Sequence, residues 1–84
     1  MLTSEQLRAA RMLLRWEQKD LAETSKVSLP TIKRLETRPG PIQANESTLA
    51  ALQRALEAAG VIFISENGEG PGVRLKKVST SPSE

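Results

Sequence analysis

The stretch QKDLAETSKVSLPTIKRLE, residues 18–36, decides the fold. It contains two short helical patterns that meet at a tight break, Ser25-Lys26-Val27. Ser28 is a good N-cap for the second helix because its hydroxyl can accept an orphan backbone N–H, and Pro30 falls in the first turn, where a missing N–H costs nothing. The apolar positions that predict one buried face across both helices are Leu21, Ala22, Val27, Ile32 and Leu35.

This spacing resembles the helix-turn-helix of the Cro and phage-repressor type, the XRE family. The family's pattern is Gln, three residues, Ala, three residues, Gly, an apolar residue and Ser or Thr, followed by a helix with apolar-x-x-apolar-Glu. The matching residues are Gln18, Ala22, Lys26, Val27, Ser28, Ile32, Leu35 and Glu36. Only Lys26 departs, since the family has Gly in a left-handed conformation there. Lys26 therefore either adopts that conformation at a cost of about 1–2 kcal/mol, or the turn differs slightly.

The resemblance implies a mainly α, four-to-five-helix, phage-repressor-like DNA-binding domain over residues 1–60. It implies a transcriptional regulator, with repression favoured, that inserts the helix 28–37 into the major groove of a two-fold operator as a homodimer. The residues expected to contact bases are Ser28, Leu29, Pro30 and Arg34, and those expected to contact phosphates are Gln18, Thr31, Lys33 and Arg38. Arg34 is the principal candidate because it can bond guanine in a fork, whereas Leu29 and Pro30 offer only apolar contact to thymine methyls.

The first helix is predicted to run from Ser4 to Leu14. Thr3 and Gln6 form a capping box at its start. Arg11 is the one polar member of its apolar stripe. In the family that the chain resembles, an Arg at this position pairs with the Glu that ends the recognition helix, here Glu36; the alternative is that Arg11 extends to solvent along its aliphatic stem.

Composition excludes several function classes. The 84 residues contain no His, no Cys and one Asp, so we expect no enzyme, no metal site, no disulfide and no cofactor. No apolar run spans a bilayer, which suits a bacterial or phage protein of the cytoplasm. Residues 1–38 contain eight Lys or Arg and five Asp or Glu, whereas residues 39–73 contain one and four. The basic half is therefore the half expected to meet DNA.

The sequence after residue 38 predicts one helix followed by a β-hairpin. Two prolines and a glycine at Pro39-Gly40-Pro41 end the preceding helix. A core helix follows from Glu46 to Ala59, capped by Asn45 or Ser47. Residues 61–77 predict a C-terminal β-hairpin around a glycine-rich turn, and residues 78–84 a disordered tail.

The hairpin is the predicted dimerisation element. Val61 and Phe63 face one side of its first strand, while Ile62 and Ile64 face the other. One apolar face can cover the helices, for which Leu52, Leu56 and Trp16 are candidates, and the second needs another protein surface. Two alternatives stay open: Ile62 or Ile64 packs under the loop 39–45, or the chain is a protein-interaction module, such as the antitoxin of a toxin–antitoxin pair.

Overall fold

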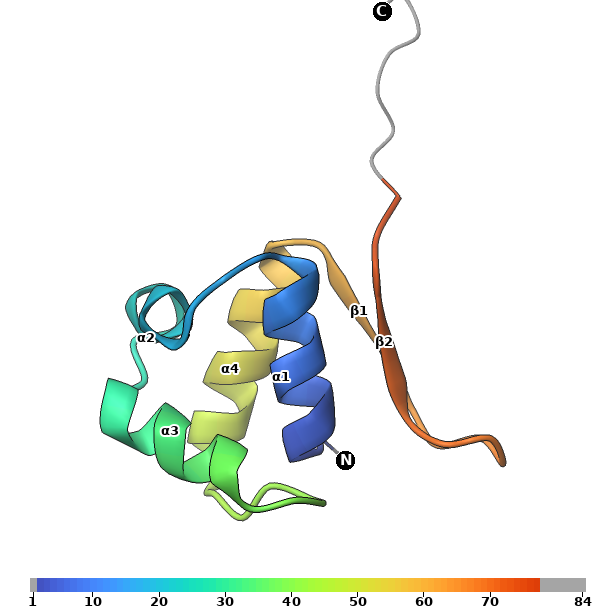
Figure 1. Ribbon diagram of the computed structural model, residues 1–84, viewed down its shortest axis with the longest axis horizontal. Helices are drawn as coiled ribbons and strands as arrows, with labels where there is room; N and C mark the ends of the chain where they lie inside the picture. The colour runs from blue at the N-terminus through green and yellow to red at the C-terminus, as the bar shows by residue number, and fades with distance from the viewer. Residues whose placement is uncertain (1, 78–84) are drawn as a thin grey trace, which may run out of the picture.

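The computed structural model describes residues 2–77, and the predicted tail 78–84 lies outside them. Within the described residues, four helices are followed by one antiparallel hairpin, so the predicted mainly helical fold with a C-terminal hairpin is confirmed. Figure 1 shows α1 and α4 side by side, with α2 and α3 on one side of them and the hairpin on the other. The elements are α1 (Ser4–Leu13), α2 (Gln18–Ser25), α3 (Leu29–Thr37), α4 (Glu46–Ala58), β1 (Val61–Ile64) and β2 (Gly72–Leu75).

Helix α1 begins with the predicted capping box. The Thr3 hydroxyl accepts the backbone N–H of Gln6 at 3.0 Å, and the side-chain Oε1 of Gln6 accepts the backbone N–H of Thr3 at 3.0 Å. The helix ends at Leu13, one residue earlier than predicted, with Leu14 as its C-cap. Likewise α4 ends at Ala58, with Ala59 as its C-cap, one residue before the predicted end.

A short turn joins α2 to α3. Lys26 has φ 67° and ψ 15°, so it adopts the left-handed conformation itself and the turn is not altered to avoid it. The Ser25 hydroxyl accepts the N–H of Val27 at 3.1 Å and fixes the chain just after this residue. Ser28 caps α3, and Pro30 is its second residue, where no intrahelical bond is lost.

The core lies where the four helices meet. Trp16 and Val27 are half-buried and pack against it from the loop before α2 and the turn after it. The fully buried apolar side chains come from all four helices and are Leu7, Ala10, Leu21, Ile32, Leu52 and Leu56. None of the helices among residues 2–77 is long and apolar enough to cross a membrane.

The loop between α3 and α4 is tied to the start of α1. The N–H of Ser4 donates to the Gly40 carbonyl at 2.9 Å, and the N–H of Ile42 donates to the Leu2 carbonyl at 3.0 Å. Leu2 and Ile42 are both buried, so this short antiparallel pairing also adds two apolar side chains to the core.

The hairpin lies against α1, and β1 also contacts α4. Its register pairs Val61 with Leu75 and Phe63 with Val73, so these residues share the inner face. The hairpin is therefore covered by α1 as well as by α4, the helix that carries the expected Leu52 and Leu56. A side-chain amide contributes to the contact with α1: Gln6 Nε2 donates to the carbonyls of Ile64 at 3.2 Å and Gly72 at 2.9 Å, linking α1 to both strands.

Candidate functional site

The outer surface of α3 is polar and basic. Its exposed residues follow the spacing of one helix face, and the residues on the opposite face are buried in the core. Because the helix is amphipathic in this way, its outward face is held in one orientation by the core contacts behind it. The exposed residues are Pro30, Lys33, Arg34 and Thr37, and the buried ones are Ile32, Leu35 and Glu36.

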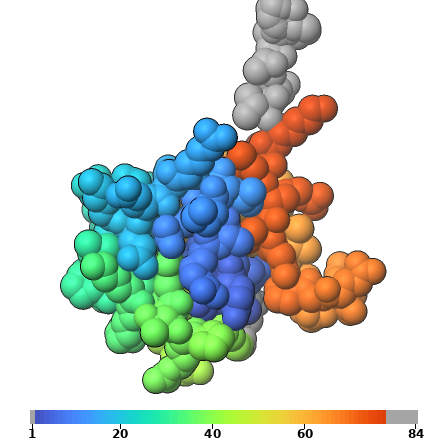
Figure 2. Space-filling model, viewed as in Figure 1, coloured from blue at the N-terminus to red at the C-terminus, as the bar shows by residue number. Residues whose placement is uncertain are grey.

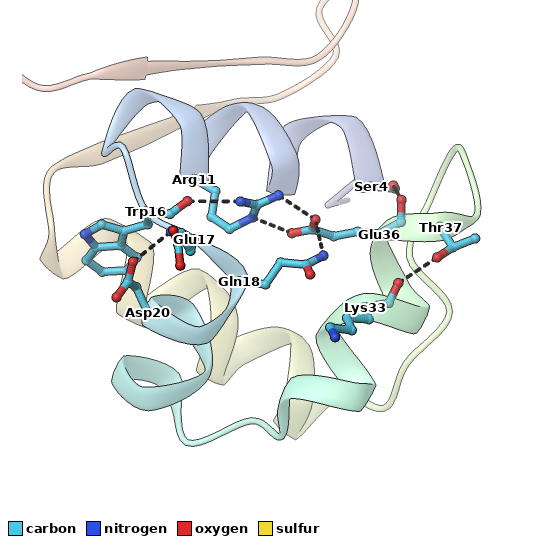
Figure 3. Close-up of polar contacts among 9 residues, drawn as sticks. All are labelled: Ser4, Arg11, Trp16, Glu17, Gln18, Asp20, Lys33, Glu36 and Thr37. Carbon is cyan, nitrogen blue, oxygen red and sulfur yellow. Dashed lines mark hydrogen bonds and ion pairs between the residues drawn. The ribbon is translucent and has the colours of Figure 1, made fainter.

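An ion pair between Arg11 and Glu36 fixes the end of α3 to α1. Arg11 Nε donates to Glu36 Oε2 at 2.9 Å and Nη2 donates to Oε1 at 2.8 Å, a two-bond fork. The two side chains are only 15% and 4% exposed, so Arg11 does not extend to solvent. Figure 3 shows Arg11 between Glu36 and Trp16, whose carbonyl accepts from Nη1 at 3.0 Å. The guanidinium therefore joins α1, the loop before α2 and α3.

Two further residues complete this cluster from α1 and α2. Gln18 Nε2 donates to Glu36 Oε1 at 3.0 Å, so the carboxylate accepts from Gln18 as well as Arg11. The buried Ser4 hydroxyl donates to the backbone carbonyl of Glu36 at 3.2 Å. Sequence reasoning missed Ser4, because a small polar residue just inside a capping box carries no signal for a contact with a distant helix.

Gln18 is the first residue of α2, and its side-chain amide carries two N–H groups that can bond different acceptors. One N–H of its amide is taken by Glu36, whereas an amide nitrogen carries two. The second N–H remains a possible donor to a phosphate at the start of α2. Beside it, Asp20 Oδ2 accepts the N–H of Glu17 at 2.8 Å, which satisfies one of the exposed donors there.

The N-terminus of α3 brings the two predicted hydroxyls together. The Ser28 hydroxyl accepts the N–H of Thr31 at 3.3 Å and donates to the Thr31 hydroxyl at 2.8 Å. The Ser28 hydroxyl is therefore used in capping α3, whereas the Thr31 hydroxyl accepts from Ser28 and keeps its own O–H as a donor. Leu29 is half-buried and Pro30 is exposed, so Pro30 presents the larger part of its side chain at this end.

Two of the predicted basic residues, Arg34 and Arg38, lie towards the C-terminal end of α3. Arg34 and Arg38 are both exposed, and together with Thr37 they line a depression of about 280 Å³ between α3 and the loop 38–45. Lys33 is exposed one turn before Thr37, whose hydroxyl donates to the Lys33 carbonyl at 2.7 Å. Arg34 and Arg38 therefore border the same depression, and Lys33 is not among the residues that line it.

The predicted dimer residues lie apart from this surface. Ile62 pairs with Arg74, and Ile64 with Gly72, on the outer face of the hairpin. Figure 1 shows α3 and the hairpin on opposite sides of α1 and α4, so the structure does not combine the two predicted sets into one site.

A carboxylate supports the loop beside α3. The N–H groups of Glu5 itself and of Gly40 lower the pKa of the Glu5 carboxyl below its usual 4.5, and Arg8 acts in the same direction. Gly40 donates to Glu5 Oε1 at 3.1 Å. Across residues 2–77, no three His, Cys, Asp or Glu side chains gather in a way that could hold a metal ion.

Comparison of the chain with protein-family models and with curated proteins gave no match.

Proposed function

We propose that the protein is a sequence-specific regulator of transcription that binds double-stranded DNA. In this proposal α2, the turn and α3 act as a helix-turn-helix, and α3 enters the major groove by its N-terminal end. The observation that supports it best is the exposed, polar and basic face of α3, fixed from behind by the Arg11–Glu36 pair. A short helix held this firmly can present its side chains to base edges in a single orientation.

Arg34 is the proposed base reader. It is exposed, lies one turn after Pro30 on the outer face of α3, and makes no ion pair among the described residues. A guanidinium can donate two parallel hydrogen bonds to O6 and N7 of guanine, worth about 1–3 kcal/mol of discrimination against another base. Leu29 and Pro30 would add apolar contact to thymine methyls at the entering end of the helix.

Phosphate contacts would hold α3 in register. Lys33 and Arg38 supply exposed charges, and the Thr31 hydroxyl and the second N–H of Gln18 supply neutral donors. Such contacts carry no sequence information but contribute much of the affinity, and they make it fall as salt is raised. The net charge favours the same half of the chain, since residues 1–38 hold eight Lys or Arg and five Asp or Glu, whereas residues 39–73 hold one and four.

Selection of binding sites from random duplex DNA tests this proposal. The parent should enrich a recurring site that contains guanine, and Arg34→Ala should enrich sites with relaxed preference at that guanine. Lys33→Ala is the matched phosphate variant on the same helix face, and it should keep the site while binding all sequences more weakly. Enrichment of no site by the parent, or of an unchanged site by Arg34→Ala, would overturn the assignment of α3 as the reading helix.

A further inference from the structure

A groove lies where α1, α4 and β2 all end. Its volume is about 510 Å³, within the range of about 300–1,000 Å³ that small-molecule sites occupy. Figure 2 shows the surface of α1 directly beside that of the hairpin, so segments far apart in the sequence border the groove together. The lining residues that matter below are Leu13, Arg15, Ala59, Leu75, Lys76 and Lys77.

Part of the groove lining is apolar and open to solvent. Four large apolar side chains stay exposed among residues 2–77, and two of them, Leu13 at 39% and Leu75 at 43%, line this one groove. Leu75 is on the inner face of the hairpin, paired with the buried Val61, yet the helices leave it uncovered. Ala59 is small and leaves the space beside it unfilled. Exposed apolar side chains gathered in a concave site indicate that an apolar group binds there.

Three cations share the lining with these apolar residues. Arg15, Lys76 and Lys77 are all exposed, and none of them forms an ion pair among the described residues. No Asp or Glu of residues 2–77 lines the groove. The groove therefore combines apolar contact with an excess of positive charge, and it is complementary to a molecule that has an alkyl chain and a negatively charged group.

The backbone carbonyls at this end of the molecule have other partners. The N–H of Arg15 donates to the Met12 carbonyl at 3.0 Å, and the N–H of Gly60 donates to the Glu57 carbonyl at 3.0 Å. The N–H of Lys76 donates to the Gly60 carbonyl at 2.6 Å. Backbone N–H groups, and not the three cationic side chains, therefore satisfy these carbonyls.

Arg15 occupies a position that favours glycine. Its φ of 58° lies in the left-handed region, where a residue with a Cβ is strained. Glycine would relieve that strain but would remove a guanidinium from the groove. Backbone strain that persists at a concave, charged site supports a role for the strained residue in binding.

We propose that this groove binds a single-chain amphiphile with an anionic head, a free fatty acid. The alkyl chain packs against Leu13 and Leu75, and the carboxylate meets the three cations. A protein partner would need a larger surface, since a standard interface takes about 20–30 residues from each side. None of the residues proposed to contact DNA lines the groove, so this inference is independent of the proposed function.

Titration of the isotope-labelled full chain with dodecanoate, below its critical micelle concentration, tests the proposal by nuclear magnetic resonance. The amide shifts of residues that line the groove should change and saturate, with a dissociation constant of about 1 mM or lower. Octanoate should bind more weakly, by about fourfold for each CH₂ that loses its contact. Acetate, which lacks the chain, and dodecyltrimethylammonium, which reverses the charge, should leave these amides unchanged.

Matched substitutions separate the groove from its surroundings. Leu13→Ser should weaken dodecanoate binding about fivefold or more, whereas Met12→Ser, at the neighbouring exposed residue outside the groove, should bind as the parent does. Arg15→Gly should raise the melting temperature by about 4 °C, because it relieves the positive φ. The same variant should bind dodecanoate about 2–5-fold more weakly, so a loss of binding would accompany a gain in stability.

The proposal is wrong if dodecanoate shifts no amide of the groove, or if Leu13→Ser and Met12→Ser lose the same affinity. Unchanged affinity in Arg15→Gly would remove the cations from the site. Co-sedimentation with vesicles of anionic phospholipid, without binding of monomeric dodecanoate, would also overturn it and assign this surface to a membrane.

Discussion

Removal of the Arg11 guanidinium should destabilise the whole fold. Arg11→Met keeps most of the aliphatic length but deletes two of the three side-chain hydrogen bonds that the Glu36 carboxylate accepts. It also frees the Trp16 carbonyl and leaves a carboxylate that is 4% exposed with Gln18 as its remaining partner. Breaking a buried pair in this way costs about 3–5 kcal/mol, whereas an exposed pair contributes about 0–1.

That loss is large for this chain. A protein of 84 residues has a free energy of unfolding of roughly 4–13 kcal/mol. Since each kcal/mol shifts the melting temperature of so small a domain by about 4–8 °C, Arg11→Met should lower it by at least about 12 °C. Thermal and urea unfolding, followed by helical circular dichroism, measure the change.

A double-mutant cycle separates the pair from its surroundings. Glu36→Gln preserves shape and removes the charge, and the double mutant R11M/E36Q removes both charges. Because the double mutant leaves no buried unpaired charge, its loss should be smaller than the sum of the single losses by about 2 kcal/mol. Additive losses of a few tenths of a kcal/mol each, the scale of surface pairs, would refute the reasoning.

Three further substitutions test the structure around the site. Lys26→Gly should raise the free energy of unfolding by about 1 kcal/mol in urea titrations, because Lys26 is left-handed at φ 67°; an unchanged or lower value would count against a strained turn. Glu5→Gln should reduce stability at pH 7. Because the folded pKa of Glu5 is lowered from 4.5, its contribution is present above that value and lost as pH falls through the folded pKa. An equal difference between Glu5→Gln and parent at pH 7 and pH 3 would contradict this. Gln6→Ala should speed hydrogen exchange in β1 and β2 while sparing α3, and uniform protection in both would remove Gln6 as the link to the hairpin.

The α2–turn–α3 segment was predictable because its signals are local. The N-cap Ser28, the proline two residues later and the apolar spacing each act within a few residues, and the structure forms these elements at the predicted positions. Sequence spacing marked Arg11 as an odd member of an apolar stripe, but its partner Glu36 came from the family resemblance alone. Nothing in the spacing itself says which distant carboxylate a buried arginine will meet.

The position of the hairpin against α1 could not be predicted from local sequence signals. The capping box already accounted for Gln6, so nothing suggested that its amide would also reach strand residues 58 and 66 positions away. The contact of Leu2–Ser4 with the loop 40–42 is equally non-local and has no periodic signature. Such contacts depend on how the helices pack, which is settled only when the whole core forms.

We propose that α3 reads DNA through Arg34. The most direct measurement is a fluorescence anisotropy titration of a site selected by the parent, beside a scrambled duplex, with parent, Arg34→Ala and Arg54→Ala. Arg54 is a matched control because it is an exposed arginine on α4. Arg34→Ala should bind the selected site about 5–150-fold more weakly, the equivalent of about 1–3 kcal/mol, and the scrambled duplex nearly as well as the parent, while Arg54→Ala should follow the parent on both. Equal affinity of the parent for the two duplexes, or equal losses for both arginine variants, would contradict the claim.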